Sequence, residues 1–451
     1  MIAPARTAAL AALRAIDEGR IDLPTALAQS RERLPDDRDR ALAADIIAGT
    51  LRWRATLDHL IAQIAKRSLD RLDTEVVNVL RLSLYQILHL TRVPASAVVD
   101  DAVDLVRAAR KPSASGFVNA VLRTTLRQRN RLPLPPRPDD PASDGAAAVA
   151  YLSVTKSHPA WLMQRRVDRY GFDAAEAWAD FDNTTPSLTL RANRLRTTRE
   201  ELAASLLDGD IETTSTTGAP DGLIVTAGNP LRTGRDGRFF VQDEASQLVA
   251  LAVGAKPGER ILDLCASPGG KATELAAVMN DQGTLIACDV RPRRVRLLRE
   301  TVQLSGAASI RVVQVARSGP LPFADGFDRV LVDAPCSGLG TVRRDPDIKW
   351  RRRPEDLPGL AASQIELLDR AAAVVRPGGT LVYATCSSEP EENEEVVASF
   401  LASHADFALS RLGEEPGSLL AAYVDDLGFL RTLPFKHRLE AFFAAALIRT
   451  K

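Results

Sequence analysis

Two hydrophobic periodicities divide this chain. From about 4 to 130, Ala- and Leu-rich positions recur every three or four residues, which is the spacing of one face of an α-helix. From 241 to 451, short apolar runs of strand length alternate with helical stretches. The first pattern predicts an all-helical module. The second predicts a doubly wound, mostly parallel sheet of the Rossmann-like α/β class.

The part of the chain between these two patterns is mixed. The segment LPLPPRPDDPASDG is dense in Pro, Asp and Ser and has no periodicity, which is typical of a linker. After it, helical segments precede short alternating runs such as SLTLRANRL and GLIVTA. We therefore predict an all-α domain over 1–131, a linker over 132–147, a small α+β domain over 148–240 and the α/β domain over 241–451.

The predicted strands of the α/β domain are RILDLCA, TLIACDV, IRVVQVA, FDRVLVDAP, GTLVYATCS and FFAAALIR. In open parallel sheets of this kind, ligands bind at the carboxyl ends of the strands. The polar residues that end these runs are therefore the candidate site residues.

Charge and cysteine content narrow the class of protein. Lys plus Arg equals Asp plus Glu at 58 each, so any basic surface must be local. Candidate basic stretches lie at 123–131, 291–299 and 343–353, and each has the alternative interpretation of a solvated helix face or loop. The four cysteines contain no CxxC pair, and Arg6 and Arg14 interrupt the apolar N-terminal run. We expect a cytoplasmic monomer in a reducing compartment, with no metal and no membrane partner.

A glycine turn lies between a predicted strand and helix in ILDLCASPGGKATELAAVM. Gly269 and Gly270 allow close approach of a ligand to the backbone, and the helix start offers unpaired N–H groups. The spacing matches neither GxGxxG nor a phosphate loop. The next strand ends in Asp289, 19 residues after Gly270, where a carboxylate can accept both hydroxyls of a ribose. Together these features indicate an adenosyl cofactor, and the alternative for Asp289 is a cap on the helix that begins near Pro292.

The fourth and fifth predicted strands end in DAPCSGLG and YATCSSEPEENEE. Asp333, Cys336 and Cys386 should therefore meet at the binding edge of the sheet. A thiol beside an acid in a cofactor crevice is a candidate nucleophile, whereas Cys265 and Cys288 are better explained as inert core or backbone positions. Chemistry alone does not say which of the two strand-end thiols attacks.

Three motifs, DLCASPGGKAT, LVDAPCSGLGTVRRDPDIKW and LVYATCSSEPEENEEVV, resemble those of the NOL1/NOP2/Sun family of RNA 5-methylcytosine methyltransferases. The N-terminal module, with DRALAADIIAGTLRW, VLRLSLYQILH and SGFVNAVLR, resembles the NusB-like, RNA-binding helical domain that is fused to the bacterial small-subunit rRNA enzymes. The resemblance implies S-adenosyl-L-methionine as cofactor. It also implies methyl transfer to carbon 5 of a cytosine in 16S rRNA through a covalent cysteine–cytosine adduct.

The resemblance also implies residue roles. Cys386 would attack carbon 6 of the base, Cys336 would help to release the product, and Asp333 would hydrogen-bond the N3/N4 edge of the base and border the methionine end of the cofactor. Asp289 would hold the ribose. The implied cofactor loop comprises Cys265, Ala266, Ser267, Pro268, Gly269, Gly270 and Lys271.

One position departs from the family pattern. After the third strand the family commonly has Gly-Asp, whose acid contacts the adenine, whereas this chain has Val315 and Ala316. We therefore predict somewhat weaker or differently shaped cofactor binding.

Three alternatives remain. Methylation of an exocyclic amino group needs no thiol and uses [DNS]PP[YFW], where this chain has Cys336. A noncatalytic RNA-binding or antitermination factor would not need Cys336, Cys386 and Asp333 together. The same reaction on tRNA or 23S rRNA is the closest rival.

Trp350, in the Arg-rich stretch, could stack on RNA bases or pack against its own domain.

Overall fold

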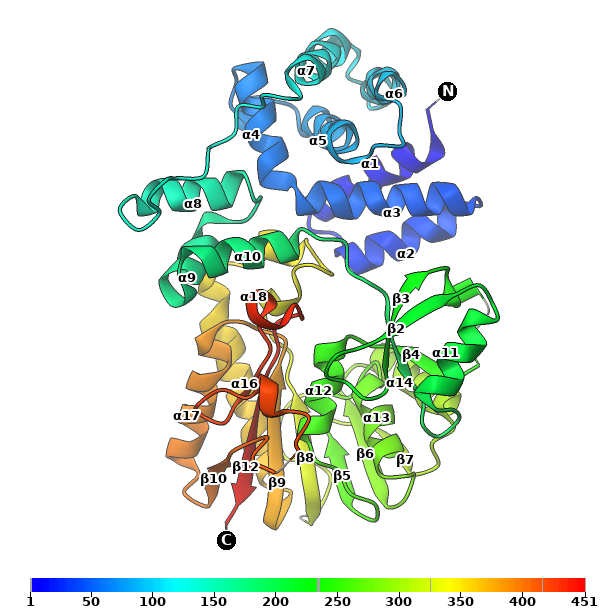
Figure 1. The fold of residues 1–451 in the computed structure, drawn as a ribbon, viewed down its shortest axis with the longest axis vertical. Coiled ribbons are helices and arrows are strands. Elements are labelled where there is room, and N and C mark those ends of the chain that lie inside the picture. Colours follow the sequence, from blue (N-terminus) through cyan, green and yellow to red (C-terminus); the bar gives the residue numbers. More distant parts are fainter. Residues whose placement is uncertain (1, 233–235, 325, 416, 451) are drawn as a thin grey trace. The chain divides into compact units, whose positions relative to one another are not determined.

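The chain forms two compact units. The computed structural model describes residues 2–232, 236–324, 326–415 and 417–450. A helical unit contains residues 1–185 and 342–352, and a sheet unit contains residues 186–341 and 353–451 (Figure 1). No helix in these described ranges is long and apolar enough to cross a bilayer.

The helical unit is built from amphipathic helices whose apolar faces form one core. Leu80, Leu82 and Leu84 of the central helix α5 are fully buried in it. Asp22, Asp36 and Asp73 cap the helices that follow them by accepting first-turn N–H groups. The α-helices of the unit are α1 Pro4–Asp17, α2 Leu23–Arg33, α3 Asp37–Arg52, α4 Arg54–Ala65, α5 Thr74–His89, α6 Ala95–Ala108, α7 Ser115–Gln128, α8 Gly145–Val154, α9 Ala160–Tyr170, α10 Phe172–Asp182 and α15 Ile348–Arg351.

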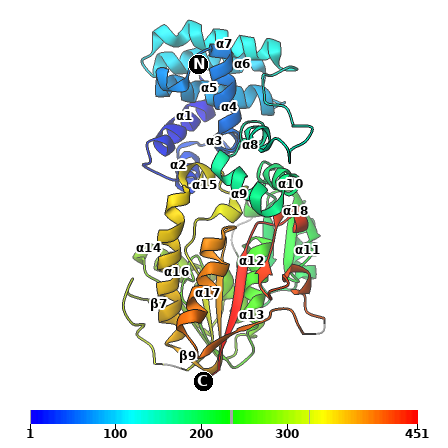
Figure 2. The same cartoon turned by 90° about the vertical axis from the view of Figure 1, so that its left-hand side faces the viewer.

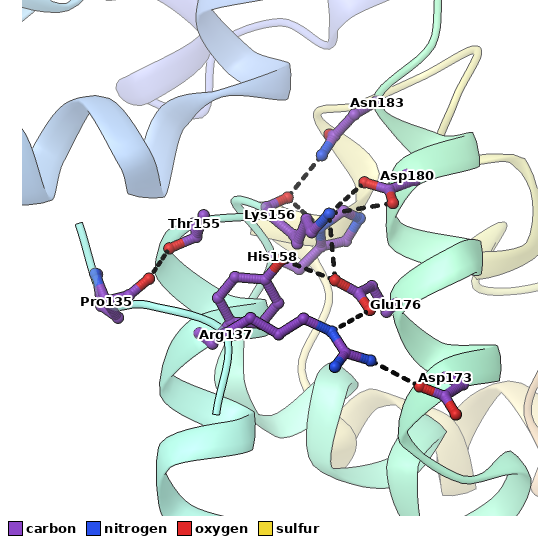
Figure 3. Close-up of polar contacts among 10 residues, drawn as sticks. Pro135, Arg137, Thr155, Lys156, His158, Asp173, Glu176, Asp180 and Asn183 are labelled. Atoms are coloured by element: carbon purple, nitrogen blue, oxygen red, sulfur yellow. Dashed lines mark hydrogen bonds and ion pairs between the residues drawn. The ribbon is translucent and has the colours of Figure 1, made fainter. Parts of the chain in front are cut away.

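The segment before α8 has no regular secondary structure, but side chains attach it to the helices that follow. Arg137 donates to Asp173 at 2.8 Å and to Glu176 at 2.9 Å, and Thr155 Oγ1 donates to the carbonyl of Pro135 (Figure 3). Helices α8 to α10 accordingly belong to the helical unit, whereas our sequence division begins the small domain at 148. The division into four segments remains a prediction about folding units.

The sheet unit contains the predicted Rossmann-like fold. Its strands are β1 Thr189–Ala192, β2 Glu212–Ser215, β3 Gly222–Ala227, β4 Phe239–Val241, β5 Arg260–Asp263, β6 Thr284–Asp289, β7 Ile310–Gln314, β8 Phe327–Asp333, β9 Val375–Thr385, β10 Phe407–Ser410, β11 Leu430–Arg431 and β12 Phe443–Arg449. Its helices are α11 Arg199–Leu207, α12 Glu244–Ala252, α13 Gly270–Val278, α14 Pro292–Ser305, α16 Leu357–Ala372, α17 Glu394–Ser403 and α18 Pro434–His437.

The main sheet has the order β10-β12-β9-β8-β5-β6-β7, in which β5 to β9 run parallel and β12 runs antiparallel to β9. Alternate residues face opposite sides: Leu331 joins the core under α12 and α13, while Val330 and Val332 join the core under α16 and α17. Figure 2 shows α16 and α17 on one face of this sheet. The predicted fold class is confirmed. The short strands β10 and β11 were missed because two to four residues give little periodicity.

A smaller antiparallel sheet precedes the main one, in the order β2-β3-β1-β4, and packs against α11. The fully buried Arg191 of β1 connects it to the main fold. Its guanidinium donates to Gln242 and to Thr273, and also to the carbonyl of Gly270. The small sheet therefore supports the first turn of α13, which follows the predicted cofactor loop.

Residues 342–352, which we call the strap, leave the sheet unit just after the Cys336 loop and fold as part of the helical unit. Lys349 of the strap is fully buried, and its amine donates to the carbonyls of Arg52 at 3.0 Å and Ser157 at 2.6 Å. Trp350 Nε1 donates to the carbonyl of Leu51. Trp350 thus contacts the helical unit and not the α/β domain to which we had assigned it, and stacking on RNA stays a prediction.

Burial lowers the pKa of Lys349 well below 10.5. The folded chain therefore binds fewer protons than the unfolded chain until the pH reaches about 10.5, so this group makes the fold more stable as the pH rises. Lys349→Met keeps the length of the side chain and removes this dependence. The free energy of unfolding of the wild type, minus that of the variant, should therefore increase by up to about 1.4 kcal/mol for each pH unit. Urea unfolding at several pH values measures the difference, and a pH-independent difference would show that the amine stays charged.

Candidate active site

The two predicted reactive cysteines lie together because β8 and β9 are parallel neighbours. Asp333 of β8 is in register with Ala384 of β9, so the loops that follow both strands leave the same edge of the sheet. The Sγ atoms of Cys336 and Cys386 are 3.2 Å apart, within hydrogen-bond distance for sulfur. The pair expected from the sequence is thus a direct contact.

An ion pair lies at the same edge. Lys271, in the first turn of α13, donates to Asp333 at 2.7 Å. Burial disfavours the charged amine, but the Asp333 carboxylate and the nearby Cys386 outweigh that effect and raise the pKa of Lys271. Lys271 is therefore an ammonium that faces both an acid and a sulfur. Our sequence interpretation placed it only in the cofactor loop.

The two thiols differ in environment. The hydrogen bond with Cys386, together with burial, raises the pKa of Cys336 well above its usual value. Cys336 therefore stays protonated at neutral pH and can donate to the sulfur of Cys386. This asymmetry could not be derived from the motifs.

A buried carboxylate joins the two cysteine loops. Glu392 is fully buried and accepts from the backbone N–H of Ser337 at 2.8 Å, the hydroxyl of Ser387 at 2.5 Å and the amide of Gln364 at 3.0 Å. Ser337 and Ser387 each follow one of the cysteines, and their hydroxyls are 3.1 Å apart. Sequence reasoning missed Glu392 because it stands in the acid-rich run EPEENEE, which has the composition of an exposed helix start.

The predicted cofactor loop joins β5 to α13. Gly269 has φ +112°, a conformation that favours glycine, and a Cβ there would come within 3.0 Å of Leu298 and Thr301. Ser267 Oγ donates to the carbonyl of Arg294 in α14. The loop is therefore held closely against α14. Burial raises the pKa of Cys288 to about 12 and that of Cys265 further, which agrees with inert thiols at these two positions.

Asp289 ends β6 and is 4% exposed. Its Oδ1 accepts the N–H of Arg291 at 3.0 Å, and its Oδ2 lies 3.8 Å from Arg294. This contact is a local turn before α14 and not the helix cap that we considered as an alternative, because the N-cap is Arg291 and has no side-chain cap bond. The contact occupies one carboxylate oxygen and leaves Oδ2 for a ligand, so the ribose role stays a prediction.

Asp263, at the end of β5, is a buried acid that sequence reasoning did not single out. It is 1% exposed, and its Oδ1 has no hydrogen-bond partner among the described residues. Burial and the nearby Asp333 raise the pKa of Asp263 to about 7. A buried oxygen without a donor, next to a glycine turn and two further acids, fits a ligand with a cationic amino group and a ribose. This chemistry matches S-adenosylmethionine.

The position expected to contact adenine is different. Ala316 is exposed and contributes its carbonyl to Arg370, which also binds the carbonyls of Arg317 and Gly319. This loop is thus fixed through its backbone, with no acid at 316. No cluster of three His, Cys, Asp or Glu side chains suited to a metal occurs in the described part of the chain.

Comparison with known proteins shows the family of the chain. The family model of the 16S rRNA methyltransferase RsmB/F matches residues 250–448, the NusB family model matches 3–127, and the ferredoxin-like domain of the RsmF/B-like methyltransferases matches 158–232. The ribosomal RNA small subunit methyltransferase B of Pseudomonas putida is 35% identical over 402 residues, 88% of each chain. The chain belongs to the RsmB family of ribosomal RNA small subunit methyltransferases.

Two further likenesses extend over almost the whole length. A probable ribosomal RNA small subunit methyltransferase B of Bacillus subtilis is 33% identical over 91% of each chain. The crystal structure of PH0851 superposes with a TM-score of 0.79 at 26% identity and covers 99% of both chains. The resemblance to the RsmB family thus covers the helical domain, the small domain and the methyltransferase domain, in the same order along the chain.

Glu392→Ala should separate the two cysteine loops of this RsmB homologue. The substitution removes the acceptor of the Ser337 N–H and one partner each of the Ser387 hydroxyl and the Gln364 amide. We expect a loss of about 2–4 kcal/mol in the free energy of unfolding and a fall in methyl transfer. Glu395→Ala, at an exposed position three residues later in α17, is the control. Thermal unfolding and methylation assays read both effects, and two variants of equal stability and rate would refute the role of Glu392.

Proposed function

We propose that this RsmB homologue transfers a methyl group from S-adenosyl-L-methionine to carbon 5 of a cytosine in 16S rRNA, with Cys386 as covalent nucleophile. The observation that supports it most directly is the pair of thiols 3.2 Å apart beside the Lys271–Asp333 ion pair. Two thiols at one strand edge are not needed for methylation of an amino group. They suit a reaction in which one bond to sulfur must form and later break.

Carbon 5 of cytosine is a poor nucleophile until carbon 6 is modified. Addition of a thiolate to carbon 6 forms a C–S bond and moves the ring electrons onto carbon 5. Carbon 5 then attacks the methyl group of a sulfonium, whose methyl–sulfur bond breaks so that a neutral thioether leaves. Loss of the carbon 5 proton to a base re-forms the double bond and expels the thiolate. The protein must therefore supply one nucleophile and one group that handles a proton.

Cys386 and Cys336 divide these tasks. Cys336, with its raised pKa, carries a proton at neutral pH, and Cys386 lies near the charged Lys271. An ammonium stabilises a neighbouring thiolate, so Cys386 is the better nucleophile and Cys336 the better partner for release. Asp333 Oδ2 is bonded to Lys271 and Oδ1 remains for the N3/N4 edge of the base, where it would favour protonation as the adduct forms.

The cofactor supplies an electrophilic methyl group. The loop from Cys265 to Lys271 would surround its methionine end, which Asp333 would border, with Asp263 available to its amino group and Asp289 to its ribose. These residues all lie at or just beyond the carboxyl ends of β5, β6 and β8, which is where such sheets bind ligands. Their part in this chain is to orient the methyl group toward the thiol pair.

The NusB match over 3–127 supports an RNA substrate, and the relatives' names point to small-subunit rRNA. The alternative is that the same reaction takes place on tRNA or 23S rRNA. The target base must leave its stack to reach Cys386, which favours a loop or rRNA that is still being assembled.

Cys386→Ala should abolish 5-methylcytosine formation in unmodified 16S rRNA, a loss of at least about 10³-fold, because no adduct can form. Cys336→Ala should instead accumulate a protein–RNA adduct, since release is impaired. Transfer from labelled cofactor, nucleoside analysis and denaturing gels distinguish the two. Normal cytosine methylation by Cys386→Ala would overturn the nucleophile assignment. If the wild type methylated only another RNA, the proposed reaction would be supported and the proposed 16S rRNA substrate would be wrong.

Ala316→Asp should tighten cofactor binding about tenfold if an acid at this position can accept from adenine, since a charge-assisted hydrogen bond contributes about 1.5 kcal/mol. Ala316→Asn is the control of equal size without charge. Calorimetric titration with S-adenosylmethionine measures both. Equal affinities for all three proteins would mean that this loop holds adenine by other contacts.

A further inference from the structure

Helix α14 carries a concentration of positive charge that the fold does not explain. Residues 291–305, RPRRVRLLRETVQLS, contain five arginines and a single acid, Glu300, although the whole chain has equal numbers of basic and acidic residues. All five arginines are exposed. Interspersed charges of both signs would suffice to keep a helix face soluble. We call Arg291, Arg293, Arg294, Arg296 and Arg299 the α14 arginine surface.

The helix has one face for the core and another for the arginines. Val295 and Leu298 are buried, and Leu298 packs in the core under the sheet. Arg293 and Arg296 are one turn apart, and neither they nor Arg299 form an ion pair with any described residue. Only Arg294 approaches an acid, 3.8 Å from Asp289. The guanidinium groups are thus available to an outside partner.

These arginines also stand where they oppose the helix dipole. The amino end of a helix carries partial positive charge and favours acids, by about 0.3–1 kcal/mol for each charge. The first turn of α14 has no acid, and four of the five arginines lie in or before its first two turns. A cluster placed against both the dipole and its own repulsion indicates a polyanionic partner.

The position of the surface identifies the partner. The amino end of α14 follows Asp289 at the carboxyl edge of the sheet, the edge that carries Cys336 and Cys386. The cofactor loop contacts the same helix through the Ser267 hydrogen bond and through Gly269 against Leu298. An RNA strand that presents a base at this edge must place its neighbouring phosphates nearby.

We propose that the α14 arginine surface binds the backbone phosphates of the RNA beside the target nucleotide. This proposal rests on the proposed function, since that function brings RNA to this edge. Guanidinium groups bind phosphate in a bidentate manner and do not need a particular base sequence. The surface therefore positions the strand, while the sequence of the target is read elsewhere.

The test removes two of the arginines that form no ion pair with the described residues, in Arg293→Gln/Arg296→Gln. Binding of an in vitro 16S rRNA transcript is measured over a series of salt concentrations. Each lost phosphate contact lowers the slope of log affinity against log salt by about 0.7 for a single strand, so the double variant should lose about 1.4. On a fourfold rise in salt, the variant would then lose about sevenfold less affinity than wild type.

Lys256→Gln/Arg376→Gln is the matched control. It removes the same charge at exposed positions of the sheet unit, before β5 and at the start of β9 and hence at the opposite edge, where Arg376 pairs with Asp328. We expect the wild-type salt slope from this control. The α14 variant should also keep or exceed the wild-type melting temperature and affinity for S-adenosylmethionine, because its arginines oppose the helix dipole, whereas a structural role would lower both.

Kinetics separate this proposal from the proposed function. The α14 variant should raise KM for the transcript with little change in kcat, while 5-methylcytosine remains the product. If the variant kept the wild-type salt slope and KM while the wild type still formed 5-methylcytosine, phosphate binding by the α14 arginine surface would be refuted. The proposed cytosine-5 methylation would be unaffected. If the wild type made no 5-methylcytosine but the α14 variant still lost RNA affinity, the proposed cytosine-5 methylation would be refuted. Phosphate binding by the α14 arginine surface would be supported.

Discussion

The parallel pairing of β8 with β9 is the constraint on which the active site depends. Its register places Asp333 beside Ala384, so two loops that are 50 residues apart in the chain leave one edge together. The sulfur contact of Cys336 and Cys386 follows from that pairing. A shift of one residue would reverse the side-chain faces of the strand, removing Val330 and Val332 from their core, so the core packing itself holds the register.

Two polar arrangements surround the thiol pair. Glu392 ties both loops to each other through buried hydrogen bonds, which are strong where water is excluded. Lys271 and Asp333 add one charge of each sign at the mouth of the site. The thiol pair thus lies between a buried carboxylate and an ion pair, and the protonated Cys336 can donate to the sulfur of Cys386.

The strap gives the helical unit a covalent connection to the catalytic loops. It begins soon after Cys336, and its Lys349 and Trp350 bond to backbone carbonyls of the helical unit. By sequence this segment belongs to the methyltransferase motif, and its arginines suggested an RNA contact. The fully buried amine of Lys349, which donates to two backbone carbonyls, shows that part of the basic run serves packing instead. The exposed arginines of α14, with similar composition, are in the opposite situation.

The sequence by itself determined the element types, the fold class and the identities of the paired cysteines, the glycine turn and Asp289. These features depend on local periodicity and on short motifs that stay contiguous in the chain. Only the tertiary structure decided that Glu392 is buried and connects the two cysteine loops, and that Lys271 pairs with Asp333. It also decided that Asp263 keeps an oxygen without a donor and that α8 to α10 join the helical unit. Those outcomes depend on which distant residues remove a side chain from water and which polar partner they provide. Neither charge nor spacing along the chain carries that information.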